Sequence, residues 1–316
     1  MTTLTIFTPT YNRADTLPRT FASLKQQTSR DFVWFIVDDG STDESRELIA
    51  SWIASVDFHI EYVYQPNAGK HNAHNLAVSR SQTELFLILD ADDELLPHAV
   101  DLITSEWARV SRTEKNRLAG IWTLSCTEDG QICGDKFPEE SLDTSLQAMR
   151  YKHRCNGERL PCFTTAVLRQ YLFPWTPPGL CAYISEGYIW TAITRRYVIR
   201  FLNVPCRIYH QGCGLSAMAR HEYRMSRSVV FGYAAPLAND LTWFWYAPGF
   251  FFFSAIQLVR YGMFCGELRR IAQSLCWQAK ALLVCAVPVA VLLLMRDYVS
   301  GRIGRQLAPK EQFGGA

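Results

Sequence analysis

The sequence predicts an α/β protein with a mostly parallel sheet and helices on both of its faces. Apolar runs that suit strands alternate with runs that suit helices from the first residues onward, and their connections are short. This alternation is typical of parallel sheets built from β-α-β units. Polar clusters follow several of the predicted strands, at the edge of a parallel sheet where ligands bind. In the C-terminal part of the chain, long uncharged stretches predict apolar helices instead.

The first hundred residues carry the clearest elements. Their patterns predict strands over 4–8, 32–37, 60–64 and 85–89, and helices over 17–27, 44–55 and 72–79. Asp15 and Thr16 are candidate caps of the first helix, and Pro18 is tolerated in its first turn. Residues 111–222 are less regular, with a helix expected over 187–196 and a strand over 198–203.

The composition is typical of a folded protein. At 316 residues, with 48% hydrophobic and 20% charged residues, the chain can bury a full core. Its ten cysteines are scattered without a Cys-x-x-Cys motif, so we expect reduced thiols rather than a disulfide scaffold or a zinc site. The N-terminal residues lack the pattern of a secretory signal, which predicts a cytoplasmic location. We expect no nucleic-acid partner.

Three acidic residues follow the fourth predicted strand. In the stretch FLILDADDELLP, Asp90, Asp92 and Asp93 fall where an apolar strand leaves the sheet. One Asp there would be explained as a turn residue or a helix cap. Three within four residues repel one another unless a cation or an array of donors is present, so a hard divalent metal is the better explanation. Asp38 and Asp39 end the second strand at the same edge, and the two acidic ends together predict a nucleotide pocket.

These motifs resemble those of a known family. The segments TPTYNR, VDDGSTDES, NAGKHNAHNLAV and LDADD, in this order and spacing, resemble the inverting family 2 glycosyltransferases. The resemblance is specific over residues 1–100, weaker to about residue 220, and absent beyond. It implies a GT-A fold with a Rossmann-like sheet, a nucleotide-sugar donor, for which a UDP-sugar is favoured, and a Mn²⁺ or Mg²⁺ ion that bridges the diphosphate.

The resemblance also implies roles for individual residues. In the family, the Asp at the end of the second strand contacts the base, and the Asp-x-Asp element contacts the ribose and the metal. The implied donor-site residues are Thr8, Pro9, Tyr11, Asp39, Asp90 and Ala91, with Asp92 as a metal ligand.

Lys70 and His210 are further candidates with two interpretations each. Lys70, in AGKHN, supplies positive charge to the diphosphate or is a solvated lysine at a helix start. His210, in RIYHQ, is a candidate metal ligand or diphosphate contact, because some relatives carry a His after the last strand of the domain. A lone His is more often structural.

Inverting transfer also needs a base that takes the proton of the acceptor hydroxyl. The family has an acid for this at a helix start about a hundred residues after the metal motif, commonly as Glu-Asp. The matching stretch here is AYISEGYIW, so the resemblance implies Glu186 as the base, with Gly187 where the family has a second acid. Ser185 and Glu186 are also suited to capping the helix, and the two roles are compatible.

The C-terminal part has two uncharged stretches, residues 241–259 and 281–295. The first is rich in aromatic residues, which favour the membrane interface, and the second is short for a hydrocarbon core of about 30 Å. Basic residues flank both. Helices lying in the membrane interface are the favoured interpretation, followed by a re-entrant hairpin and then by core packing.

Three parts are therefore expected. Residues 1–110 form the nucleotide-sugar-binding half, residues 111–222 form the acceptor-binding and catalytic half, and residues 223–316 form an apolar, basic region that associates with the membrane. Residues 1–110 carry 8 Lys/Arg and 16 Asp/Glu, whereas residues 223–316 carry 10 and 4, so the overall charge of +2 hides a gradient along the chain.

The expected function is that of a metal-dependent hexosyltransferase in bacterial surface-polysaccharide biosynthesis. It would act on a lipid-linked saccharide acceptor, as a peripheral or monotopic protein on the inner face of the cell membrane. A non-catalytic nucleotide-binding membrane adaptor and a nucleotidyltransferase are the alternatives. The released product separates the three: nucleoside diphosphate for a glycosyltransferase, pyrophosphate for a nucleotidyltransferase, and no product for an adaptor.

Overall fold

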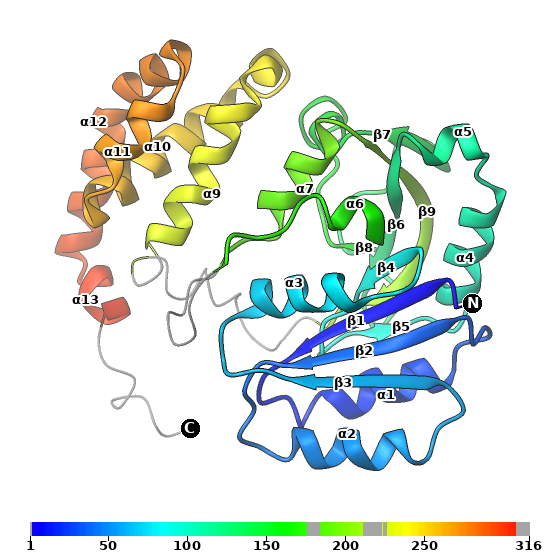
Figure 1. Cartoon of the computed structure of the whole chain (residues 1–316). Coiled ribbons are helices and arrows are strands. Elements are labelled where there is room, and N and C mark those ends of the chain that lie inside the picture. The colour runs from blue at the N-terminus through cyan, green and yellow to red at the C-terminus, as the bar shows by residue number, and fades with distance from the viewer. Residues whose placement is uncertain (1, 176–183, 211–222, 224–225, 308–316) are drawn as a thin grey trace. The chain divides into compact units, whose positions relative to one another are not determined.

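The computed structural model describes residues 2–175, 184–210, 223 and 226–307, which belong to two compact units. The first unit comprises Met1–Cys181 and Ile189–Gln211, and the second comprises Ala182–Tyr188 and Gly212–Ala316. The first contains the sheet and the second is helical (Figure 1). The expected three-part division of the chain remains a prediction.

A nine-stranded sheet forms the centre of the first unit, in the order β3-β2-β1-β4-β8-β6-β9-β5, with β7 paired to β9. Strands β3, β2, β1 and β4 are parallel, as the sequence predicts, and β8 is antiparallel to both β4 and β6. The strands are β1 (Leu4–Thr10), β2 (Phe32–Asp38), β3 (His59–Tyr64), β4 (Leu85–Ile88), β5 (Glu94–Leu95), β6 (Leu118–Cys126), β7 (Ser141–Thr144), β8 (Arg159–Thr164) and β9 (Val198–Ile208).

Helices cover both faces of this sheet, which confirms the predicted fold class (Figure 1). Helices α1, α2 and α4 bury Leu24, Trp52 and Trp107 in the core on one face. Helices α3, α6 and α7 bury Ala77 and Leu168, among others, in the core on the opposite face. The helices of this part are α1 (Leu17–Lys25), α2 (Ser45–Ile53), α3 (Lys70–Arg80), α4 (Ala99–Arg109), α5 (Arg112–Lys115), the π-helix η1 (Ala148–Lys152), α6 (Thr165–Leu168) and α7 (Gly187–Thr194).

The strand register places the carboxyl ends of β1, β2 and β4 together. Thr10 pairs with Asp38, and the backbone N–H of Asp39 donates to the carbonyl of Thr10 at 2.8 Å. On the other side of β1, the N–H of Leu89 donates to the carbonyl of Phe7 at 2.9 Å. The residues that follow these three strands therefore leave the sheet at the same edge, where ligands bind in parallel α/β folds.

Helix α1 departs from its predicted capping. Thr16 occupies the N-cap position, but its side chain makes no capping hydrogen bond. Its hydroxyl instead donates to the carbonyl oxygen of Ala91 at 2.9 Å, so a tertiary contact has replaced the local one. Pro18 does lie in the first turn, as predicted.

The second unit consists of helices in the residues that the structure describes. Helix α10 packs against both α9 and α12. Its helices are α9 (Ser226–Asn239), the 3₁₀-helix η2 (Leu241–Tyr246), α10 (Pro248–Cys265), α11 (Leu268–Ser274), α12 (Trp277–Val299) and α13 (Arg302–Leu307).

Candidate active site

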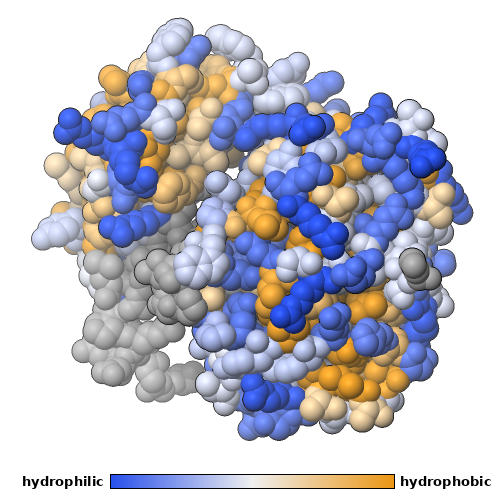
Figure 2. Space-filling model, viewed as in Figure 1, coloured by the Kyte–Doolittle hydropathy of each residue, from blue (hydrophilic) through white to orange (hydrophobic). Residues whose placement is uncertain are grey.

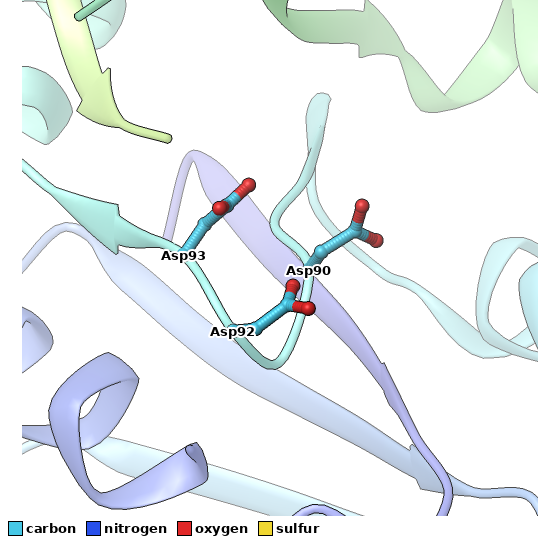
Figure 3. Close-up of side chains that lie close together, drawn as sticks. All are labelled: Asp90, Asp92 and Asp93. Atoms are coloured by element: carbon cyan, nitrogen blue, oxygen red, sulfur yellow. The ribbon is translucent and has the colours of Figure 1, made fainter. Parts of the chain in front are cut away.

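The turn between β4 and β5 brings three carboxylates together. Asp90, Asp92 and Asp93 each offer an oxygen within 4.8 Å of the others, and their carboxylates gather on the same side of the turn (Figure 3). Helix α1 holds the backbone of this turn, because Thr16 donates to Ala91 and the hydroxyl of Thr20 donates to the carbonyl of Asp93 at 2.8 Å. The two threonines are one helical turn apart, so both reach the same turn.

Each of the three carboxylates lies beside one cation. The ammonium of Lys70, at the start of α3, is 2.5 Å from Asp90 Oδ1. The guanidinium of Arg13, after β1, is 3.8 Å from Asp92 Oδ2, and that of Arg207, on β9, is 3.2 Å from Asp93 Oδ2. Three acids within four residues need a cation or donors nearby. In this structure, Lys70, Arg13 and Arg207 supply that positive charge.

Burial separates Asp93 from Asp90. Asp93 is 1% exposed, and burial raises the pKa of its carboxyl to about 7, although Arg207 acts in the opposite direction. Burial also tends to raise the pKa of Asp90, but the charge and hydrogen bond of Lys70 outweigh it, and the pKa is lowered. Asp90 is therefore a charged acceptor that water can reach, whereas Asp93 is a buried partner of Arg207.

Arg207 is a residue that the sequence analysis missed. It is almost fully buried, its Nε donates to the hydroxyl of Ser125 at 2.9 Å, and it lies 3.3 Å from a carboxylate oxygen of Glu158. A buried arginine needs such partners because an unpaired charge is costly in a protein interior. Its sequence signal was limited to an arginine near the end of a strand, three residues before His210.

His210 is held at the edge of the triad. Its backbone N–H donates to Asp93 Oδ1 at 3.3 Å. Its Nε2 lies 2.7 Å from Glu94 Oε1, and its Nδ1 lies 2.5 Å from Glu128 Oε1. Both ring nitrogens are thus engaged by carboxylates in this arrangement, and the proposed role as a metal ligand stays a prediction.

Asp39 organises the loop that leads into α3. Its carboxylate accepts from the backbone N–H groups of Ala68 and Gly69, both at 2.8 Å, and from Nε2 of Gln65 at 2.6 Å. Gly69 has a φ of +93°, a conformation that suits glycine, and Lys70 follows it directly. Asp39 thereby positions the residue that contacts Asp90. Its predicted contact with a nucleotide base is not tested by these bonds.

The remaining predicted donor-site residues line the end of β1. Thr8 is fully buried, and its hydroxyl accepts from the indole N–H of Trp34 at 2.9 Å. Pro9 is half-buried, whereas the Tyr11 side chain is 50% exposed beyond the strand end. Tyr11 is therefore the most exposed of the three, Pro9 is partly accessible, and Thr8 supports the strand beneath.

The loops after β1 and β2 are joined by hydrogen bonds. Asn12 has a φ of +51°, and its side chain accepts from the backbone N–H of Thr42 at 2.8 Å. The N–H of Ala14 donates to the Asp43 carboxylate at 2.9 Å. These bonds hold the segment that carries Tyr11 and Arg13, so Arg13, also missed by the sequence analysis, faces Asp92 from an ordered loop.

Glu186 lies immediately before α7 and is half-buried. It belongs to Ala182–Tyr188, which are part of the second unit. Its role as a base remains a prediction.

Comparison with known proteins assigns the domain that contains these residues. The family model described as glycosyl transferase family 2 matches residues 5–109, which include Asp39 and the triad. The teichoic acid poly(glycerol phosphate) polymerase of Staphylococcus epidermidis is 39% identical over 101 residues, which are 32% of this chain and 14% of that protein. The chondroitin synthase of Pasteurella multocida is 30% identical over 156 residues, 47% of this chain and 16% of that protein. The chain thus spans about a sixth of the length of these two curated relatives.

Solved structures resemble the chain over almost its whole length. Staphylococcus aureus TarS superposes with a TM-score of 0.61 at 14% identity, covering 95% of this chain and 55% of that one. TarS 1-349 in complex with UDP-GlcNAc gives 0.57 at 16% identity, covering 95% and 92%. The mannosyltransferase PcManGT from Pyrobaculum calidifontis, in complex with GDP-Man and Mn²⁺, gives 0.54 at 17% identity, covering 96% and 84%. The chain therefore has a GT-A fold, and its residues 5–109 form a glycosyl transferase family 2 domain.

Proposed function

We propose that this protein is a metal-dependent, inverting glycosyltransferase that moves a hexosyl group from a nucleoside-diphosphate sugar to a lipid-linked saccharide. The observation that carries the proposal is the triad of Asp90, Asp92 and Asp93 at the carboxyl end of β4, inside the family 2 domain and beside the loop that Asp39 organises. A UDP-sugar is the favoured donor, because a solved structure with this fold, TarS 1-349, is in complex with UDP-GlcNAc.

The residues present fit a hard divalent cation such as Mn²⁺ or Mg²⁺. The triad offers oxygen ligands only, and the side chains of Asp90 and Asp92 are 38% and 24% exposed, so both are accessible. Asp93 is occupied by buried Arg207, which leaves Asp90 and Asp92 to hold the ion. When bound, such an ion stabilises the negative charge that develops on the leaving diphosphate.

The chain's own residues supply the rest of the chemistry. Tyr11, together with Pro9 and Asp39, would contact the nucleoside, and Lys70 and Arg13 are placed to contact phosphate oxygens near the triad. Glu186 would accept the proton of the acceptor hydroxyl as that oxygen attacks the anomeric carbon on the face opposite the diphosphate. A carboxylate is suited to this step because an uncharged hydroxyl is a weak nucleophile.

The proposed acceptor is carried by the membrane, and the second unit supports this part of the proposal. Helix α12 is long and apolar enough to cross a bilayer by length and composition, with a mean hydropathy of 2.1 and 28% of its most apolar window buried. Its buried side carries small residues such as Ala279, Ala286 and Ala290. Its outer side carries larger apolar residues, including Val284 at 71% exposure and Leu292 at 67%. Small residues inside and large apolar residues outside are the pattern of a helix that faces lipid.

A buried ion pair in this unit points the same way. Arg260 of α10 and Asp297 of α12 are buried and form an ion pair, and the Tyr223 hydroxyl donates to Asp297 at 2.5 Å. Ionisable residues within membrane-embedded segments face the protein interior and pair with one another in this way. In Figure 2, apolar side chains lie at the surface over the helices of this unit.

Basic residues at both ends of α12 favour a helix within one leaflet. Lys280 and Arg296 bound its uncharged stretch, and Trp277 and Tyr298 add an exposed aromatic residue at each end. The basic side of a membrane protein is the cytoplasmic side, so both ends of α12 are expected on that face. We therefore place the protein monotopically on the inner face of the cell membrane.

The test is a screen of the full-length protein against UDP-, GDP- and dTDP-sugars with Mn²⁺ or Mg²⁺, using membrane lipid extract as the acceptor. Binding is followed by thermal stabilisation, because a ligand of the folded state raises its apparent stability. Products are identified by mass. Free nucleoside diphosphate together with a glycosylated lipid supports the proposal. Pyrophosphate release would instead identify a nucleotidyltransferase, and donor binding without any product would identify a nucleotide-binding adaptor.

A further inference from the structure

The three cations beside the triad differ in whether they can leave it. Arg207 and Asp93 have side-chain exposures of 5% and 1%, so this ion pair is sealed inside the first unit. Lys70 and Asp90 are 35% and 38% exposed, and Arg13 and Asp92 are 41% and 24% exposed. Exposed ion pairs are weak, typically worth about 0.2–1 kcal/mol, so Lys70 and Arg13 can be drawn from their carboxylates by a competing anion.

Lys70 and Arg13 also occupy the oxygens that a metal ion would use. The ammonium of Lys70 lies 2.5 Å from Asp90 Oδ1, which is the distance of a direct hydrogen bond. A metal ion that coordinates this oxygen has to displace the ammonium. As long as the ammonium remains there, its positive charge repels the ion. Arg13, at 3.8 Å from Asp92, opposes the ion in the same way but less closely.

A diphosphate offers these two cations alternative partners. Phosphate oxygens accept strong charge-assisted hydrogen bonds from ammonium and guanidinium groups. Lys70 is the first residue of α3, whose N-terminal end favours anions through the helix dipole. Arg13 is on the loop that also carries Tyr11. Both side chains are long and exposed enough to turn from a carboxylate to a phosphate without movement of the backbone.

We propose that Lys70 and Arg13 are exchangeable cations that couple the binding of the metal to the binding of the donor. Without donor they neutralise Asp90 and Asp92 and lower the affinity for a divalent ion. A nucleoside diphosphate draws them onto its phosphates and frees the two carboxylates, so the ion and the donor each tighten the binding of the other. Arg207 does not exchange and keeps Asp93 out of this process. The inference rests on the proposed function, because it takes the diphosphate of the donor as the anion.

The test measures Mn²⁺ binding to the full-length protein by the electron paramagnetic resonance signal of free Mn²⁺, without and with saturating UDP. Lys70→Met is compared with the wild type and with Lys115→Met. Lys115 is a matched control, because it pairs with Glu84 at 3.0 Å, has a similar side-chain exposure of 28%, and is not in contact with the triad. Circular dichroism and thermal unfolding verify that all three proteins are folded.

Lys70→Met is expected to bind Mn²⁺ alone about fivefold more tightly than the wild type, which corresponds to the loss of an exposed ion pair. The factor by which UDP tightens Mn²⁺ binding is expected to fall by about fivefold or more. By reciprocity, the factor by which Mn²⁺ tightens UDP binding falls equally. Arg13→Met is expected to change both quantities in the same directions and by less, and Lys115→Met to change neither.

Two outcomes separate this inference from the proposed function. Sugar transfer by the wild type, combined with an unchanged or weaker Mn²⁺ affinity in Lys70→Met, overturns the exchange and leaves the proposed function standing. The second outcome is tighter Mn²⁺ binding in Lys70→Met together with no UDP or GDP binding and no transfer in any variant. This result overturns the proposed function. It also shows that a diphosphate is not the anion that draws Lys70 away.

Discussion

Asp90, Asp92 and Asp93 lie in different surroundings, although they share one short turn. Asp93 is buried, and its partner Arg207 is equally inaccessible. Asp90 and Asp92 are accessible and face side chains that can move. Buried ion pairs contribute little net stability but are costly to break from one side. We therefore propose metal binding for the two accessible acids and a structural role for the third.

Asp92→Asn is predicted to abolish metal-dependent donor binding without unfolding the protein. The amide keeps the size of the side chain but removes the charge that attracts the ion and Arg13. Loss of a residue that only orients a metal ligand lowers metal affinity by about 10–100-fold. Loss of the ligand itself is therefore expected to lower the affinity at least as much. Thermal shift with UDP-sugar, with and without Mn²⁺, measures the effect. Asp57→Asn, at an exposed ion pair outside the site, serves as the control. Unchanged metal-dependent stabilisation in Asp92→Asn contradicts the assignment.

Glu186→Gln tests the proposed base. Glutamine cannot accept the proton of the acceptor hydroxyl but retains the size and most of the capping ability of glutamate, so transfer is expected to fall by about 10²–10⁴-fold with donor affinity nearly unchanged. If Glu186 only caps α7, stability falls by up to about 1 kcal/mol and turnover stays near that of the wild type. Single-turnover transfer and donor affinity are measured on the same protein. Glu106→Gln on α4 is the matched control.

At the scale of elements, α3 connects the site to the core. Its first residue, Lys70, contacts Asp90, and one turn later His74 is buried among Phe7, Phe86 and Phe173 in edge-on ring contacts with centroid distances of 5.1–5.9 Å. Among the described residues, neither ring nitrogen of His74 has a hydrogen-bond partner. This arrangement makes α3 a rigid support for Lys70, and it buries a titratable group in an apolar surrounding.

The burial of His74 predicts a pH dependence of stability. Burial lowers the pKa of His74 from 6.5 to about 3. The unfolded chain therefore binds a proton at His74 as pH falls through about 6.5, whereas the folded chain does not, so stability decreases as pH decreases. Between pH 8 and pH 5.5 this residue lowers the free energy of unfolding by about 1.4 kcal/mol.

His74→Leu removes this titration and is expected to flatten the pH dependence by that amount. Urea denaturation at pH 8 and pH 5.5 measures the difference between the two proteins. His74→Phe is a second apolar variant, in case leucine leaves a cavity. The same loss of stability between the two pH values in wild type and both variants would show that His74 is protonated in the folded protein.

The elements of the first hundred residues were predictable because local patterns specify them. Apolar runs with short polar connections placed β1, β2, β3 and β4, and the acids after them marked the ligand edge. Strand β8 could not be placed in the same way, because its antiparallel insertion between β4 and β6 depends on long-range pairing. Thr16 was predicted as a cap from its local position, whereas its hydroxyl bonds to Ala91, 75 residues away.

The candidate site was predictable in its acids and in Lys70, but not in its two arginines. Asp39, Asp90 and Asp92 stand in motifs whose residue types indicate their chemistry. Arg13 reaches the triad from the loop after β1 and Arg207 reaches it from β9, and nothing in their neighbouring residues indicates that pairing. Their contribution is electrostatic and tertiary, so it became visible only when the sheet brought the distant segments together.

At the scale of the whole molecule, charge and hydropathy are divided along the chain. Residues 1–110 carry an excess of acids, and residues 223–316 carry 10 Lys/Arg against 4 Asp/Glu. Three of these acids, Asp90, Asp92 and Asp93, lie beside basic side chains at the triad. The basic residues accompany the apolar helices of the second unit, a combination that suits an anionic membrane surface. The region proposed to bind the donor and the region proposed to bind the membrane therefore have opposite electrostatic character.

The last prediction concerns the outer side of α12, whose contact with lipid is tested by Leu292→Lys and Val284→Lys. Each places a charge where the side chain is now 67% or 71% exposed, so neither disturbs the packing against α10. A charge within the apolar part of a bilayer is costly, so each variant is expected to lose at least about tenfold in affinity for vesicles containing anionic lipid. Vesicle flotation of the full-length protein measures this affinity. Ile53→Lys, at a 48% exposed position on α2, controls for an added lysine elsewhere.

Wild-type binding is also expected to weaken with added salt or with zwitterionic lipid, because basic residues near the surface contribute about 1 kcal/mol each. Flotation equal to wild type in both α12 variants would mean that this side of the helix does not meet lipid, and a change of oligomeric state in the same variants would identify it as a contact between copies of the chain.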